Sequence, residues 1–354
     1  MRLIKIAVLY ALRACGGFAV CRWLTRRGLR ILCWHGIAQD DEHRFVPSLF
    51  ITRQAFQARI AWLKRKGFPI VPLDEAVRGL ERGSLPRCAT VLTFDDGWAS
   101  WRRAAPLAAG LPVTGYVMSG YVDRPQPMFY LFAKYAYWKS GRERLTTRFG
   151  TLTYPELWAE ARRLPVDQRA ELLPELAAAA AVDLDGISRD RRFSILTSGE
   201  LRELGWDLQL HTHMHEWGAQ REQIEHEIRL NASHLQPIAR SPLRHFCYPA
   251  GEYYPENFPV LKALGIRSAT TCERRLNYPG DNPLALGRLL DNARIPQVLF
   301  EAEMSGVIEL ARAAIRYCRA PQRATRMKAN SFGHLPFVGV ELCLFLSGKY
   351  ASIF

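Results

Sequence analysis

Two short polar clusters in the sequence have the composition of a metal-dependent hydrolytic site. Asp95 and Asp96 directly follow one apolar run, and His211 and His215 follow another. One carboxylate and two imidazoles form a ligand set that leaves open positions on a divalent metal. The second aspartate is then free to act as a base toward water that the metal activates. The two clusters therefore predict a catalytic metal site, provided that the fold brings them together.

The expected secondary structure explains how these clusters can meet. From Leu29 onward, apolar strand-like runs alternate with amphipathic helices, a pattern typical of a parallel α/β sheet or barrel. We expect strands at residues 29–34, 70–71, 89–94, 113–118, 206–211, 245–248, 266–271 and 284–290, and helix caps at Thr52 and Ser198. The carboxyl ends of parallel strands gather on one face, where sites are usually built. Both polar clusters are therefore expected on that face.

The alternation is interrupted between residues 121 and 197. This stretch contains an aromatic run at residues 128–138, followed by alanine-rich helical sequence at residues 156–181. We interpret it as a helical insertion rather than a separate domain. We expect the aromatic run to pack in the protein interior rather than to form a platform that binds sugar rings.

The two clusters resemble the signature motifs of a known family. Residues 93–97 (Thr-Phe-Asp-Asp-Gly) and the His-Thr-x-x-His run at 211–215 are similar to those of the polysaccharide deacetylases (carbohydrate esterase family 4, the nodulation-deacetylase homology domain). The resemblance covers residues 29–292, apart from the insertion. It implies a distorted (β/α) barrel with about seven strands. It also implies that Asp95 is the catalytic base and that Asp96, His211 and His215 bind a divalent metal, usually zinc.

A third motif follows the strand expected at residues 245–248. Residues 246–251 (Phe-Cys-Tyr-Pro-Ala-Gly) resemble the family's substrate-binding turn, which includes Tyr248, Ala250 and Gly251 and whose backbone N–H helps to form the oxyanion hole. The arginine that steadies the catalytic aspartate in the family is absent, because Cys247 occupies its position. Arg244 and Arg288 are the candidates to replace it.

The fourth motif is displaced along the chain. Residues 32–35 (Leu-Cys-Trp-His) resemble a Leu-x-x-His motif whose histidine protonates the leaving amine, but the family usually has it near the C-terminal end. The poly-N-acetylglucosamine deacetylase branch is circularly permuted in this way. We therefore expect His35 to be the catalytic acid. His213 corresponds to no ligand of the family.

These motifs predict a hydrolase that removes an N-acetyl group from an amino sugar of a cell-envelope polysaccharide or lipid-linked glycan. Two alternatives stay open. One is a deformylase or other deacylase of a polyprenyl-linked amino sugar. The other is a catalytically impaired protein that binds glycans without hydrolysing them.

The net charge of +14 is concentrated at the two ends of the chain. Residues 1–30 contain seven basic side chains and residues 310–328 contain six, with no acidic side chain in either stretch. Both stretches lie beside apolar sequence, so residues 1–28 and 293–354 are expected as amphipathic segments on an anionic membrane surface. A partner nucleic acid is not expected, since the rest of the chain is close to neutral.

The cysteines suggest a compartment. All eight are scattered, and none forms a Cys-x-x-Cys pair, which favours reduced thiols over a disulfide framework. The sequence therefore predicts a peripheral protein on the cytoplasmic face of the membrane. We further expect the mouth of the active site on the same side as both ends of the chain, within reach of a lipid-linked sugar.

Overall fold

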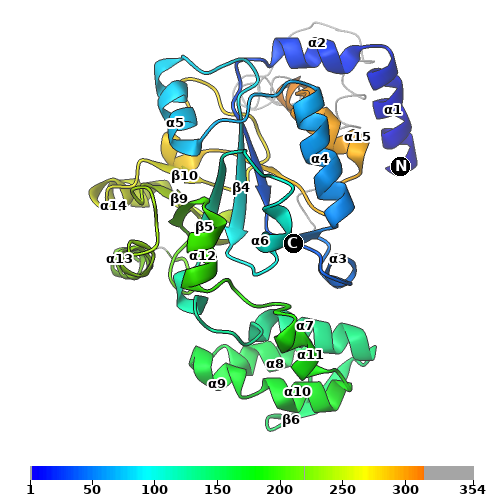
Figure 1. The fold of residues 1–354 in the computed structure, drawn as a ribbon, viewed down its shortest axis with the longest axis vertical. Helices are drawn as coiled ribbons and strands as arrows, with labels where there is room; N and C mark the ends of the chain where they lie inside the picture. Colours follow the sequence, from blue (N-terminus) through cyan, green and yellow to red (C-terminus); the bar gives the residue numbers. More distant parts are fainter. Residues whose placement is uncertain (1, 219, 315–354) are drawn as a thin grey trace, which may run out of the picture.

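The computed structural model describes residues 2–218 and 220–314. Its centre is a parallel sheet of seven strands in the order β10-β9-β8-β5-β4-β1-β11. Figure 1 shows this sheet in the upper part of the molecule. The strands are β1 (Arg30–Trp34), β4 (Thr90–Asp96), β5 (Val113–Val117), β8 (Asp207–Leu210), β9 (His245–Cys247), β10 (Ser268–Thr270) and β11 (Leu289–Leu290). The predicted α/β fold with about seven strands is confirmed.

The sheet curls, and residues 286–290 link its two edges. Leu286 forms a bridge with Thr270 of β10, whereas Leu289 and Leu290 pair with β1. The strand expected at residues 284–290 is thus divided into a 3-10 turn, η4 (Pro283–Ala285), and the short β11. The strand expected at 70–71 is reduced to one bridge between Ile70 and Thr90.

The two faces of the sheet have different cores, because successive side chains of a strand point to opposite sides. On the inner face, Ile31 and Val91 pack against α5 (Leu73–Arg82), which fills the amino-terminal end of the barrel. On the outer face, Trp34 and Phe94 pack under the surrounding helices. These helices are α4 (Arg53–Arg65), α6 (Trp101–Ala104), α12 (Ser198–Leu204), α13 (Arg221–Leu235) and α14 (Phe258–Ala263).

Two helix starts test the expected caps. Thr52 caps α4 as expected, with its hydroxyl accepting from the N–H of Ala55. For α12 the cap is Thr197 rather than Ser198, because Thr197 forms a reciprocal capping box with Glu200.

The insertion follows β5 and is not wholly helical. Its helices are α7 (Phe129–Ser140), α8 (Tyr154–Ala161), α9 (Val166–Ala170), α10 (Leu173–Ala180) and α11 (Leu184–Arg189), preceded by the 3-10 turn η1 (Ser119–Tyr121). An antiparallel hairpin, β6 (Arg144–Thr147) and β7 (Gly150–Thr153), was not expected. Most aromatic side chains of α7 are buried, which supports packing over a sugar platform.

The first two helices pack beside the last described one. Leu9 of α1 (Arg2–Ala14) and Phe18 of α2 (Gly17–Leu24) form a cluster with Val298 and Ala302 of α15 (Gln297–Met304). In Figure 1 this group and the insertion lie at opposite ends of the molecule. The apolar and basic tail expected after residue 314 lies outside the described residues.

Among the described helices, none by itself has the length and hydropathy needed to cross a membrane. Residues 3–14 and 17–24 reach that threshold only as a pair, and the two helices are bent by 82° relative to each other.

A glycine in β5 tests the packing of the outer face. A Cβ atom on Gly115 would lie 2.6 Å from the ring of Trp101, which is fully buried. We predict that Gly115→Ala lowers the free energy of unfolding by about 1–3 kcal/mol through overpacking. Urea denaturation measures this effect. At Gly199 of α12 the nearest atom would be 3.9 Å away, so Gly199→Ala is the control and is expected to be neutral or slightly stabilising. Equal stability of the two variants would contradict the packing described.

Candidate metal centre and catalytic site

Asp96 is held at the end of β4 with its two oxygens in different environments. Oδ2 accepts a hydrogen bond of 2.7 Å from the indole N–H of Trp98. Oδ1 lies 3.3 Å from Nε2 of His211 and 3.7 Å from Nε2 of His215. The φ of Asp96 is 81°, in the left-handed region, and this turn is what directs the carboxylate toward the histidines.

His211 is prepared to act as a ligand through Nε2. Its Nδ1 lies 2.8 Å from the backbone oxygen of Cys247, so the ring donates there and directs Nε2 toward Asp96. This nitrogen donates to the carboxylate when it carries a proton and can bind a metal when it does not. Its backbone N–H donates to Oδ1 of Asn231, which fixes the end of β8 against α13. His215 has a φ of 60°, so the loop turns back and places both rings beside Asp96.

Asp96, His211 and His215 fit a divalent metal. Metal–nitrogen and metal–oxygen bonds of about 2.0–2.2 Å at tetrahedral angles separate two ligand atoms by roughly 3.3–3.5 Å. The separations of 3.3 and 3.7 Å from Asp96 are close to that value. Hydrogen bonding from His211 and the nearby imidazoles outweigh the effect of burial and keep the pKa of Asp96 below its ordinary value. The carboxylate is therefore ionised, as a metal ligand must be.

Asp95 is buried inside the barrel and has a different set of partners. Its Oδ1 accepts a hydrogen bond of 2.7 Å from Nη1 of Arg288, which is itself buried. Burial alone would raise the pKa of this carboxyl, but the charge of Arg288, with those of His35 and His211, lowers it to about 2. Asp95 thus stays ionised near neutral pH.

The second oxygen of Asp95 faces two thiols and His35. The Sγ atoms of Cys33 and Cys247 lie 3.4 and 3.5 Å from Oδ2. Nε2 of His35 lies 3.9 Å from the same oxygen, and its side chain is partly open to solvent. The structure therefore brings His35 to the site, 60 positions before Asp95 in the chain.

Two further groups of possible ligand atoms include Asp95, one with Cys33 and His35 and one with His211 and Cys247. Both groups contain Asp95, whose charge Arg288 already neutralises. A cation bound to either group would be repelled by the guanidinium of Arg288. Of the three groups, the one around Asp96 is therefore the best suited to hold a cation.

The turn after β9 supplies a hydrogen-bond donor. Ala250 has a φ of 55°, and no hydrogen bond from its N–H occurs within residues 2–218 and 220–314. Position 251 requires a glycine because Cys272 lies close to it. A Cβ atom on Gly251 would lie 2.5 Å from the backbone nitrogen of Cys272. The free N–H of Ala250 is thus the donor available for an oxyanion.

Three other residues considered from the sequence lie elsewhere or are already engaged. Arg244 precedes β9 at the amino-terminal end of the barrel and is exposed, so it is not the replacement arginine. The hydroxyl of Tyr248 is buried and donates to the backbone of Leu284. His213 bonds to Ser119, and its ring packs against that of His234.

Supporting residues were missed by the sequence analysis. Trp98 bonds Asp96, and Asn231 links the His211 backbone to the end of β5 through the carbonyl of Val117. Glu227, one turn before Asn231 on α13, accepts the N–H groups at positions 213 and 214. Glu227 and Asn231 are polar residues four positions apart on the buried side of an amphipathic helix, and this pattern could have indicated their supporting role.

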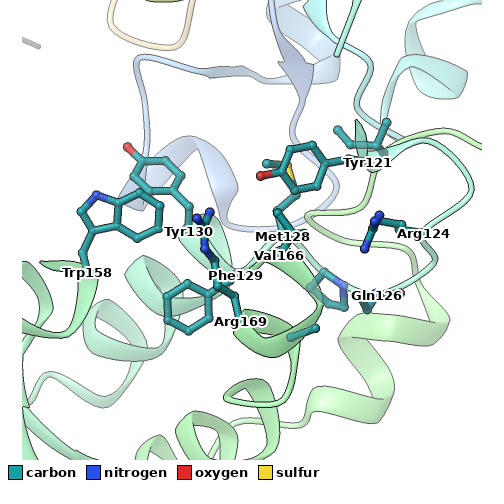
Figure 2. Close-up of a pocket in the computed structure, with 12 residues that line it drawn as sticks. Tyr121, Arg124, Gln126, Met128, Phe129, Tyr130, Trp158, Val166 and Arg169 are labelled. Carbon is teal, nitrogen blue, oxygen red and sulfur yellow. The ribbon is translucent and has the colours of Figure 1, made fainter. Parts of the chain in front are cut away.

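Two hollows lie near this face. Figure 2 shows the first, which is lined by aromatic side chains such as Tyr121, Tyr130 and Trp158 at the base of the insertion. The cavity has a volume of only about 30 Å³, which is too little for a sugar ring. The second is an open groove of about 850 Å³ between Gln39, Ala99 and the stretch from Arg189 to Arg192. One lining residue, Ala99, is three residues after Asp96, which places it within about 11 Å of that residue.

The site and the first and last described residues of the chain lie on opposite sides of the barrel. α2 leads into the amino end of β1, whereas His35 follows its carboxyl end. The last described residues lie with α1, as Figure 1 shows. The expectation of a shared side is therefore wrong for these residues, because parallel strands place their starts and their ends on opposite faces.

The ion pair between Asp95 and Arg288 can be tested by removing the charge of Arg288. We predict that Arg288→Gln destabilises the fold by about 3–5 kcal/mol at pH 7, because it leaves a buried charge unpaired. The pKa of Asp95 is depressed, so this stability exists above the unfolded pKa of about 3.9 and is lost as pH falls through about 2. Without Arg288, burial raises the pKa, and the acid limb of activity moves to higher pH. Denaturation and a pH–rate profile measure both effects.

Arg267→Gln is the matched control for this prediction. Arg267 is 27% exposed and pairs with Glu81 at the surface, so its loss is expected to cost about 0–1 kcal/mol. A similar small effect for Arg288→Gln would contradict the assigned role.

Sequence comparison relates this site to known proteins. Residues 197–269 match the family described as polysaccharide deacetylase; the match includes His211 and His215 but not β4. The chain is 26% identical over 159 residues to the poly-beta-1,6-N-acetyl-D-glucosamine N-deacetylase of Escherichia coli (strain K12). That alignment covers 42% of this chain and only 23% of the relative, and the Escherichia coli O157:H7 protein gives the same values.

Solved structures show the same fold. The Streptococcus pyogenes deacetylase PplD, in complex with acetate, superposes with a TM-score of 0.54 at 15% identity, over 78% of this chain and 98% of that one. IcaB from Ammonifex degensii superposes with a TM-score of 0.52 at 20% identity, over 79% and 97%. The family match, the fold and the two motifs agree, and the chain contains a polysaccharide deacetylase domain.

Proposed function

We propose that the protein is a metal-dependent hydrolase that removes the N-acetyl group from an amino sugar of a glycan. One observation supports this most directly: two adjacent carboxylates have separate partners. Asp96 faces two imidazole nitrogens, whereas Asp95 faces a guanidinium and His35. These different surroundings suit Asp96 to bind a metal and Asp95 to act as a base.

The chemistry follows from these positions. A divalent metal held by Asp96, His211 and His215 would polarise the amide carbonyl and acidify water. Asp95 accepts a proton from the water that attacks the carbonyl carbon. The N–H of Ala250 donates to the oxygen that becomes negative. His35 protonates the sugar nitrogen as the carbon–nitrogen bond breaks, so acetate and a free amine leave.

Zinc is the metal we propose. Two imidazole nitrogens and one carboxylate oxygen are ligands that zinc accepts, and three protein ligands leave positions for water and substrate. The relatives that align with this chain are named for poly-beta-1,6-N-acetyl-D-glucosamine. A β-1,6-linked N-acetylglucosamine oligomer is therefore the first substrate to test.

The base is tested by Asp95→Asn. The amide keeps the shape but cannot accept the proton, so the rate is expected to fall by about two to four orders of magnitude with metal content unchanged. Acetate release and elemental analysis measure the two quantities. Loss of metal in this variant would mean that the roles of Asp95 and Asp96 are reversed.

The metal site is tested by His211→Ala and by a chelator. Both are expected to remove the metal and abolish acetate release. His226→Ala is the control, because His226 is an exposed histidine on α13. Full activity of the folded, metal-free protein would contradict the proposal.

His35→Gln tests the acid. We expect a slower rate on an N-acetyl sugar and a smaller loss on an acetyl ester with a good leaving group, because such a group departs without protonation. Equal losses on both substrates would exclude the role of general acid.

The alternatives give different products. A deformylase of a polyprenyl-linked amino sugar would release formate rather than acetate from the matching substrates. A glycan-binding protein without activity would bind the oligomer and release neither acid.

A further inference from the structure

We propose that α1 and α2 form a docking surface for an anionic lipid membrane, with the mouth of the active site directed away from the lipid. The surface is called the docking face below. It comprises the outward sides of these two helices and the basic residues around α2.

The docking face collects the exposed apolar side chains of the described protein. Seven large apolar side chains are exposed within residues 2–218 and 220–314, and six of them lie on α1 and α2: Leu3, Ile4, Tyr10, Val20, Trp23 and Leu24. Trp23 is 60% exposed and Leu3 is 84% exposed. Such a concentration of exposed apolar side chains on two neighbouring helices, including an indole, is typical of helices that lie in the membrane interface.

The opposite sides of the same helices are anchored to the protein. Leu9 and Phe18 are buried against α15, and Arg13 forms an ion pair of 3.0 Å with Glu301. The helices are thus fixed in place while their apolar sides face outward. A lipid surface therefore meets a preformed face.

Basic residues from distant segments surround α2. The guanidinium of Arg22 donates to the backbone oxygens of Lys66 and Gly67, which brings the exposed run of residues 64–66 (Lys-Arg-Lys) beside the helix. The N–H of Cys88 donates to the oxygen of Arg26, so Arg87 lies there as well. The first acidic residue of the sequence is at position 40. The charge around the apolar face is therefore complementary to anionic headgroups.

The fold sets the orientation of a docked molecule. β1 begins at Arg30, just after α2, and runs to His35 over about 16 Å at 3.3 Å per residue. The site opens at that far end, and Figure 1 shows the insertion at the same end, opposite α1 and α2. A sugar attached to a lipid of the same membrane would have to reach past the whole barrel. This step rests on the proposed function: the glycan is expected to arrive from the aqueous side.

Co-sedimentation with vesicles tests the surface. The full chain is expected to bind vesicles of phosphatidylglycerol and phosphatidylcholine at least about tenfold more tightly than vesicles of phosphatidylcholine alone. High salt should weaken the binding without removing it, because salt screens the charges but not apolar burial. Equal binding to both vesicles would overturn the role of charge.

The double variant Trp23→Ser, Leu24→Ser tests the apolar side. It is expected to lose at least about tenfold in affinity. Trp138→Ser is the matched control, since Trp138 is the seventh exposed apolar side chain and lies on α7 in the insertion. Equal binding by the double variant and the wild type would mean that residues 315–354 or a second copy of the chain cover the face, and would overturn the proposal.

Hydrogen exchange of the vesicle-bound chain tests the orientation. We expect added protection in residues 2–27 and 64–67 and none in the active-site loops at 212–218 and 249–254. Protection of those loops would overturn the orientation. None of these measurements requires turnover, so they can fail or succeed independently of acetate release.

Discussion

The proposed catalytic site depends on the ion pair between Asp95 and Arg288. Both side chains are buried inside the barrel, where an unpaired carboxylate would take up a proton rather than remain charged. Arg288 keeps the pKa of Asp95 at about 2, so the carboxylate is available as a base at neutral pH. Arg288 comes from the segment that links the two edges of the sheet. The segment that closes the barrel therefore also supplies the charge that keeps Asp95 ionised.

The other half of the site depends on backbone conformation. Asp96 and His215, both at the proposed metal centre, have positive φ angles, as does Ala250 at the oxyanion turn. Such conformations cost energy in residues other than glycine and persist only where neighbours hold them. Here the neighbours are identifiable, since Trp98 bonds Asp96 and Asn231 fixes the backbone of His211. Rigid strand ends and supported turns together set the distances between ligand atoms.

The strands and the two main motifs could be predicted from the sequence, because apolar runs ending in polar residues are a local signal. The replacement arginine could only be narrowed to two candidates. Arg244 lies before β9, and Arg288 lies inside the closing segment, a difference that depends on exact strand limits. The β6–β7 hairpin was missed because its short, largely exposed strands lack an apolar run. The count of terminal charges led to the prediction of a lipid surface. The expectation that the mouth of the active site lies on the same side was wrong, because that direction depends on the three-dimensional order of the strand ends.

The closing segment also has a consequence for synthesis. The residues of the site are spread from His35 near the start of the barrel to Arg288, just before its last strand. A nascent chain that has not yet produced residue 288 has Asp95 in an incomplete barrel without its partner. Contacts between segments so distant in sequence form slowly and late in folding. Until residue 288 has been made, the chain therefore carries both motifs while Asp95 lacks the charge that keeps it ionised.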